Sequence, residues 1–388
     1  MSTARPPSLV LVGAGLQNGL IALAALQAEP EARVVLLERD AEPCGNHTWS
    51  FHAADVPPRL QSLVHDITSH RWSGYEVRFA EHERQLGLGY ASIDSRDLAR
   101  ILRQRLAEAP NAELRTSTSV EHIGARHVSL ADGSVVEGDL VVDARGPRIE
   151  PGSRCGFQKF YGVELSLDHP HGLERPLLMD ATVEQIDGFR FLYVLPLGPT
   201  RLLVEDTVFS TSAELTPARW RDRVLEEAEA RGWSSQNVVR EELGVLPMPW
   251  KAPGPKRQSR GPLRAGYRGH WFHPATGYST PQALRVAALV AGHVHAPDLL
   301  FQADDYRALV RSERRQARFA RFLNRLLFTG VSPDTRWTVF QRFYGHPESV
   351  ISRFYAGAMT RTDRARMLVG RPPRGFSIRS ALMGSALR

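Results

Sequence analysis

The chain has 388 residues, enough for two or three domains with a sizeable hydrophobic core. Hydrophobic residues make up 42% and charged residues 23%, as in ordinary globular proteins, and 31 Gly with 26 Pro are too few for a low-complexity or fibrous chain. Two cysteines, Cys44 and Cys155, exclude a disulfide framework and lack metal-ligand spacing. We therefore expect a reduced, cytoplasmic protein without a metal site.

Positive charge is concentrated towards the C-terminus. The chain has 49 basic and 42 acidic residues, and 46 of the basic residues are arginine. Residues 306–388 contain 17 arginines and four acidic residues, a net charge of +13, which leaves −6 for residues 1–305 because the whole chain carries +7. A basic end favours an anionic partner, either nucleic acid or a phospholipid surface. A solvated arginine-rich face is the alternative, and charge does not decide between these readings.

The N-terminal residues have the pattern of a dinucleotide-binding unit. An aliphatic run over residues 8–12 predicts a buried parallel strand, and a Leu- and Ala-rich stretch over residues 16–28 predicts a helix. Glycines, Gln and Asn interrupt this apolar region, which also lacks a basic leader, so it predicts neither a signal peptide nor a membrane span. A second strand is expected over residues 33–37.

Four residues around the first turn carry the expected cofactor contacts. Gly13 allows a tight turn, Gly15 lets backbone N–H groups approach a pyrophosphate, and Glu38 is placed to accept from ribose hydroxyl groups. Asn18 stands at the third glycine position of the pattern, so we expect adjusted helix packing there. The acid after the second strand favours FAD or NAD over NADP.

Two later segments favour FAD over NAD, because glycine-bearing turns more than 100 residues apart suggest one extended ligand. A strand-like stretch over residues 135–142 leads into Asp143 and Gly146. A second segment leads into a helix that we expect to begin near Pro281, with Thr280 as its N-cap. The predicted cofactor residues of this segment are Pro274, Gly277 and Tyr278, and a packed turn without a ligand is the alternative.

Arg96, before a helix expected over residues 98–107, is a further candidate for contact with the cofactor phosphates. A capped, solvated helix start explains the same pattern.

Several blocks along the chain resemble the bacterial lycopene beta-cyclases of the flavin-containing family. The block Gly-Asn-His-Thr-Trp-Ser-Phe-His at residues 45–52 is far more specific than the glycine turn. The blocks follow one another in order over almost the whole chain, at residues 12–22, 45–52, 160–164, 202–207, 246–249, 272–279, 343–345 and 366–368.

This resemblance implies a membrane-associated enzyme that holds FAD and cyclises both ψ-ends of lycopene, by way of γ-carotene, to β-carotene without net oxidation. It implies lycopene and other acyclic or monocyclic carotenes as substrates, reduced FAD as the active form, and NAD(P)H as its reductant. Carried over to this sequence, the acidic residue on which cyclisation depends is Glu205. A flavin-dependent reductase or monooxygenase acting on an isoprenoid is the competing interpretation, followed by a non-catalytic nucleotide-binding protein.

The chemistry of cyclisation suits an acid in an apolar cleft, where desolvation favours the protonated carboxyl group. Glu205 follows an apolar strand over residues 201–204, and Asp206 must face the opposite side of that strand. An exposed acid paired with Arg190 or Arg201 is the alternative reading of Glu205. Reduced flavin is either the proton donor or an electrostatic stabiliser of the cation, and the sequence does not choose.

The C-terminal part contains an amphipathic helix over residues 306–328. Arginines recur there at spacings of three and four residues, opposite an apolar side. Such a helix fits an anionic membrane surface, and a globular helix with its arginines in water fits equally well. Nucleic acid is the least favoured partner, because no nucleic-acid-binding motif accompanies the charge.

We therefore expect an α/β protein with a Rossmann-like, doubly wound FAD-binding domain, an antiparallel substrate domain and a helical C-terminal region. The FAD-binding domain is assigned residues 1–75, 92–150 and 255–300, and the substrate domain residues 76–91 and 151–254. The basic, helical and membrane-contacting region is assigned residues 301–388. The enzyme is expected to be cytoplasmic and peripherally bound to the membrane.

Overall fold

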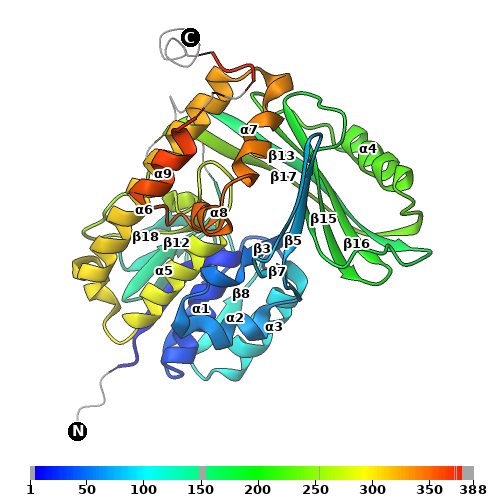
Figure 1. Ribbon diagram of the computed structural model, residues 1–388. Helices are drawn as coiled ribbons and strands as arrows, with labels where there is room; N and C mark the ends of the chain where they lie inside the picture. The colour runs from blue at the N-terminus through cyan, green and yellow to red at the C-terminus, as the bar shows by residue number, and fades with distance from the viewer. Residues whose placement is uncertain (1–4, 148–153, 253, 371, 373, 378–388) are drawn as a thin grey trace.

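The computed structural model describes residues 5–147, 154–252, 254–370, 372 and 374–377. A parallel sheet and a large antiparallel sheet form two neighbouring bodies, and the C-terminal helices lie along both (Figure 1). The expected domain boundary at residues 150 and 151 lies outside the described residues, as does the end of the C-terminal region.

The parallel sheet has the strand order β18-β12-β1-β2-β8. Its strands are short, and the three central ones are almost wholly buried, as their aliphatic runs require, whereas the edge strand β8 is half-buried. They are β1 (Ser8–Val12), β2 (Arg33–Leu37), β8 (Ala112–Arg115), β12 (Leu140–Asp143) and β18 (Leu263–Arg264). One face packs on α1 (Leu16–Ala28), α2 (Gln61–Ile67), α3 (Ser95–Glu108) and α5 (Thr280–Gly292).

The other face of the parallel sheet is covered by a three-stranded antiparallel sheet rather than by helices. Val10, Val12, Val35 and Leu37 pack there against the aliphatic residues of this small sheet. Its strands are β9 (Val120–Ile123), β10 (His127–Leu130) and β11 (Val135–Glu137). The α/β class with a parallel Rossmann-like core, an added antiparallel sheet and C-terminal helices is confirmed, and this covering layer is the detail that the sequence pattern did not predict.

The antiparallel body is a seven-stranded sheet in the order β17-β13-β16-β15-β14-β5-β6, in which only β14 and β5 pair in parallel. Its long strands are β13 (Arg154–Leu167), β15 (Phe189–Gly198), β16 (Arg201–Ser210) and β17 (Ser235–Lys251), and its short strands are β5 (Tyr75–Phe79), β6 (His82–Leu86) and β14 (Leu177–Asp180). α4 (Pro217–Ala230) packs on one face through Trp220 and Val224, at the outer side in Figure 1.

A small sheet and the C-terminal helices join the two bodies. The small sheet contains β3 (Thr48–His52), β4 (His70–Trp72) and β7 (Tyr90–Asp94). The helices are α6 (Asp304–Gly330), α7 (Trp337–Tyr344), α8 (Glu348–Tyr355) and α9 (Arg361–Leu368), and the 3-10 turns are η1 (Ala53–Asp55), η2 (Pro58–Leu60), η3 (Gly266–Gly269), η4 (Pro297–Gln302) and η5 (Pro333–Thr335). α6 contacts both β13 and β17.

Three expected element boundaries differ from the structure. α5 begins at Thr280 with Ser279 as N-cap, because the Thr280 hydroxyl donates to Ser50 O instead of capping the helix. α3 begins at Ser95, since the Asp94 side chain caps it by accepting from Arg96 N. The stretch expected as one strand over residues 135–142 is divided between β11 and β12 at Gly138, where Val10 of β1 leaves no room for a Cβ atom.

Candidate active site

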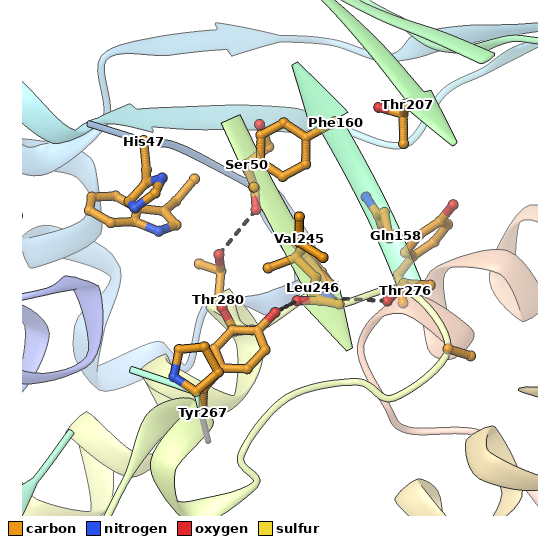
Figure 2. Close-up of a pocket in the computed structure, with 18 of the residues that line it drawn as sticks. His47, Ser50, Gln158, Phe160, Thr207, Val245, Leu246, Tyr267, Thr276 and Thr280 are labelled. Carbon is orange, nitrogen blue, oxygen red and sulfur yellow. Dashed lines mark hydrogen bonds between the residues drawn. The ribbon is translucent and has the colours of Figure 1, made fainter. Parts of the chain in front are cut away.

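A cavity of about 1140 Å³ lies between the carboxyl edge of the parallel sheet and the inner face of the antiparallel sheet. Figure 2 shows side chains that converge on it from the large sheet, namely Gln158 and Phe160 of β13, Thr207 of β16, and Val245 and Leu246 of β17. Tyr267 and Thr276 come from the segment before α5, and Thr280 is the first residue of that helix. In open α/β sheets, ligands bind at this carboxyl edge.

The glycine turn after β1 forms one end of the cavity. Gly13 has a positive φ of 90°, and a Cβ atom there would lie 3.1 Å from Ala144 O. At Gly15, a Cβ atom would meet nothing within 4 Å, so this residue borders open space at the N-terminus of α1. Glu38 fixes the turn because its Oε2 accepts from Ala14 N at 2.7 Å. Gly13, Gly15 and Glu38 all line the cavity.

Asn18 supports the same turn from behind. Its Nδ2 donates to Val12 O at 3.0 Å and to Gly13 O at 2.9 Å, and the side chain is fully buried. Asn18 does not line the cavity, so an amide at the third glycine position shapes the turn instead of leaving space for a ligand.

Three other predicted cofactor residues also lie outside the cavity lining. Arg96 donates to Asp94 Oδ2 at 2.6 Å and to Glu164 Oε2 at 3.0 Å, beside a separate small cavity. Asp143 is buried and binds Arg145, which does line the main cavity. The Pro274 carbonyl accepts from Asn324 of α6. The cofactor contacts expected of these residues stay predictions, and the placement of Arg96 favours the capped helix start that was its alternative.

The turn before α5 places Gly277 and Tyr278 on the cavity wall, which Gly146 also lines. Gly277 has a φ of +67°, and a Cβ atom there would lie 2.8 Å from Leu246 Cδ1, so glycine is required. Tyr278 Oη donates to Asp55 Oδ2 at 2.8 Å and accepts from His52 N at 2.9 Å. Its ring is thereby fixed between the parallel body and the small sheet.

β3 and the residue before it supply cavity residues to which the sequence pattern gave no role. His47, Trp49 and Ser50 all line the cavity, and burial lowers the pKa of His47, which favours the neutral imidazole. Ser50 Oγ lies 2.6 Å from Tyr193 Oη, which lies 3.2 Å from Tyr90 Oη. The signal was present in the Gly-Asn-His-Thr-Trp-Ser-Phe-His block, but its spacing alone does not say which side chains face inward.

Glu205 lies on β16, a central strand, and its side chain borders the cavity. Burial, followed by a hydrogen bond to Glu242 and the negative charge of that residue, raises the pKa of Glu205 well above its usual range, while Arg240 acts in the opposite direction. The alternative of an exposed acid paired with Arg190 or Arg201 is wrong, because Arg190 binds Asp206 and Arg201 pairs with Glu164. The surroundings of Glu205 therefore favour the protonated form of the carboxyl group that borders the cavity.

The rest of the large cavity is mainly apolar and extends towards the C-terminal helices. Its lining includes Phe160, Phe191 and Phe209 of the sheet, Leu327 of α6 and Phe340 of α7. Leu368 at the end of α9 also lines the cavity and is 47% exposed, so the apolar end of the cavity reaches the surface there. This shape suits a long hydrocarbon ligand whose end approaches Glu205.

The turn residues fit a dinucleotide cofactor at the opposite end. A glycine-bordered space at a helix N-terminus, with backbone N–H groups directed outwards, is the usual cradle for a pyrophosphate. Gln158 Oε1 adds a buried acceptor with no protein partner on the cavity wall. The arrangement can thus hold an extended cofactor beside an apolar substrate and the half-buried Glu205.

Comparison with known proteins gives a family match over nearly the whole chain. The family model described as "Lycopene cyclase protein" matches residues 8–381. A lycopene beta-cyclase from Pantoea ananas is 42% identical over 369 residues, covering 94% of each chain. The corresponding protein from Paracoccus sp. is 40% identical over 372 residues, again covering 94% of each chain.

Solved structures share the fold at low sequence identity. A probable FAD-dependent monooxygenase, pqsL from Pseudomonas aeruginosa, has a TM-score of 0.63 and 18% identity, with 87% of this chain and 98% of that chain covered. A geranylgeranyl bacteriochlorophyll reductase-like protein from Thermoplasma acidophilum has a TM-score of 0.61 and 13% identity, with 93% and 96% covered. At such identities the likeness concerns the fold alone.

Proposed function

This chain belongs to the lycopene cyclase family, and we propose that it closes the ψ-ends of lycopene into β-rings through the acid chemistry of Glu205. Its enzyme class is that of a carotenoid cyclase, with carotenes as substrates, and the resemblance inferred from the sequence blocks is confirmed. The observation that carries the proposed role of Glu205 is its position: its half-buried carboxyl group borders a long cavity lined by aromatic and aliphatic side chains and lies beside Glu242, which favours its protonated form.

The reaction begins with transfer of a proton from Glu205 to the terminal double bond of the polyene. The resulting tertiary cation is attacked by the neighbouring double bond, which closes the ring, and the ring then loses one proton. One proton enters and one leaves, so substrate and product have the same mass. Phe160, Phe191 and Phe209 exclude water that would otherwise trap the cation, and their ring faces attract positive charge.

FAD is the cofactor that the fold supports, and we propose that Gly13, Gly15 and Glu38 bind its adenosine diphosphate part. Gly146, Gly277 and Tyr278 are proposed to border the remainder. When bound in reduced form, the flavin would supply negative charge that stabilises a nearby cation. NAD(P)H is proposed only as the reductant that keeps the flavin reduced, since the cyclisation itself consumes no electrons.

We further propose that the enzyme takes its substrate from a membrane surface. Among the described residues, no helix combines the length and the hydropathy that a bilayer span needs. α6 instead presents the exposed residues Arg311, Arg314 and Arg318, while Leu323 and Leu327 of the same helix line the cavity. An anionic membrane attracts such a face, and a carotene dissolved in the bilayer then lies close to the apolar end of the cavity.

Expression in a lycopene-accumulating bacterium, followed by separation and mass measurement of the pigments, tests this function. We expect β-carotene, or γ-carotene where one end is closed, with the mass of lycopene unchanged. A gain of two hydrogens or of one oxygen would overturn the proposal in favour of a flavin-dependent reductase or monooxygenase. The same separation distinguishes one ring from two and β-rings from ε-rings.

A further inference from the structure

One row of residues crosses the antiparallel sheet at the position of Glu205. Tyr193 of β15 is paired in register with Glu205, which is paired with Gly162 of β13, which in turn is paired with Glu242 of β17. Directly opposed residues on neighbouring antiparallel strands face the same side of a sheet. Glu205 and Glu242 therefore lie on the cavity side, separated by one glycine, and both line the cavity.

Gly162 is the gap that lets the two acids approach each other. A Cβ atom at this position would lie 2.7 Å from Glu205 Cγ and 3.2 Å from Glu242 Cγ. Its φ lies outside the left-handed region, so the backbone conformation does not demand glycine here. Because glycine weakens a strand interior, its presence in the middle of β13 is explained by the close approach of the neighbouring side chains.

Glu242 is held as the hydrogen-bond acceptor of the pair. Arg240 Nη1 donates to Glu242 Oε2 at 2.7 Å, and Thr48 Oγ1 donates to the same oxygen at 3.2 Å. The Glu242 side chain is only 2% exposed, so Arg240 and Thr48 take the place of water as its hydrogen-bond donors. With two donors already directed at Glu242, the hydrogen bond between the two carboxyl groups is one that Glu205 donates.

We propose that Glu242 is a positioning residue that keeps the catalytic proton on Glu205, and that Gly162 provides the space in which the two carboxyl groups meet. This inference rests on the proposed acid role of Glu205. Once Glu205 has given its proton to the polyene, two neighbouring carboxylates repel each other. Since one proton is released from the ring per turnover, the pair regains its single proton without an oxidant or a reductant.

The charged and titratable groups around Glu205 come from three strands. β17 contributes Glu242 and Arg240, β15 contributes Tyr193, and β7 contributes Tyr90, whereas β13 contributes Gly162. Of these, Glu242 is the group whose charge favours the protonated form of Glu205. Removal of that charge lets Glu205 ionise at lower pH, and the proton donor is then lost at lower pH.

The test compares the pH profile of cyclisation for purified Glu242→Gln and Gly162→Ala variants with that of the wild-type enzyme. Substrate is lycopene in phospholipid vesicles, with FAD and a reductant present. In the wild-type profile, the rate falls as the pH rises through the ionisation of Glu205. In both variants, we expect this fall to occur about one pH unit lower. At a fixed pH on this part of the profile, the rate should therefore be about tenfold lower than in the wild type, and it should recover at lower pH. Flavin absorbance after gel filtration verifies that each variant is folded.

Two matched controls separate this effect from general damage. Glu241→Gln changes the adjacent acid, whose side chain binds Tyr161 and Arg221 on the other face, and Gly198→Ala adds a methyl group whose nearest neighbour is 3.8 Å away. Both should retain the wild-type profile. A Glu242→Gln profile that matches wild type, or that is lowered by the same factor at every pH, would overturn the proposal. The acid role of Glu205 fails separately, if Glu205→Gln retains its turnover.

Discussion

Glu205 and Asp206 are adjacent acids whose surroundings give them different tasks. Because successive strand residues face opposite sides, Glu205 borders the cavity while Asp206 faces α4. There Asp206 accepts from Arg190 Nε at 2.9 Å and pairs with Arg223, and its side chain is fully buried. We therefore expect Glu205 to serve the proposed proton transfer, whereas the ion pairs of Asp206 stabilise the fold.

Replacement of Glu205 by Gln should abolish cyclisation while FAD remains bound. The amide has the size of the acid but no proton to give. In the wild-type enzyme the donor is the protonated form, so activity should be full at low pH and should fall as pH rises through the raised pKa of Glu205. Pigment analysis over a pH series measures both effects, and substantial turnover by the variant would remove Glu205 from the acid role.

Asp206→Asn should lower the stability of the protein and leave its activity nearly unchanged, the opposite of what we expect for Glu205→Gln. The substitution leaves the buried Arg190 with a weakened partner. Breaking a buried ion pair by changing one member costs about 3 kcal/mol of the free energy of unfolding. Urea unfolding measures that loss, and the rate per folded molecule should stay near that of the wild type. Equal stability of Asp206→Asn and Glu205→Gln would contradict this division between the two faces of β16.

α6 is an element whose two sides differ in burial and charge. Val310, Ala317, Ala320 and Leu327 are buried against the body, whereas its arginines include an exposed set on the outer side. Burial, together with the positive charges of Arg318 and Arg314, lowers the pKa of Arg321, so the helix concentrates charge that an anionic surface relieves. The exposed Phe322 is 43% accessible and adds an apolar contact.

The triple variant Arg311→Gln, Arg314→Gln and Arg318→Gln should bind anionic vesicles more weakly by about 1 kcal/mol per arginine. Cosedimentation with phosphatidylserine-containing vesicles at low and high salt measures the loss. The matched control replaces Arg100, Arg105 and Arg126, which are exposed on the parallel body and pair with nearby acids. If both triple variants lose binding equally, net charge and not the α6 face determines attachment.

At the scale of the whole molecule, features that depend on neighbouring residues could be predicted from the sequence, whereas features that depend on pairing between distant strands could not. β1, α1 and β2 have the bounds that the sequence indicated, because aliphatic runs and a glycine turn act within 40 residues. Glu205 was found through a local block, but Glu242 was not. Its role depends on the register of β13 with both β16 and β17 and on Thr48, which is 194 residues away in the chain. Likewise, the side chain of Arg96 lies outside the main cavity because it binds Glu164, which is distant in the sequence.

Because the cavity lies between the two bodies, FAD should stabilise the molecule as a whole. A ligand that binds only the folded state, present at 100 times its dissociation constant, adds about 2.7 kcal/mol to the free energy of unfolding.

Gly15→Ala should be as stable as the wild type without FAD, because a Cβ atom there meets nothing within 4 Å and the φ of −83° suits any residue. The added methyl group nevertheless occupies the space proposed for the pyrophosphate. Unfolding with and without FAD should therefore show a stabilisation that Gly15→Ala loses. Gly13→Ala, strained at a φ of +90°, should already be destabilised without FAD, and an undiminished FAD effect in Gly15→Ala would place the cofactor elsewhere.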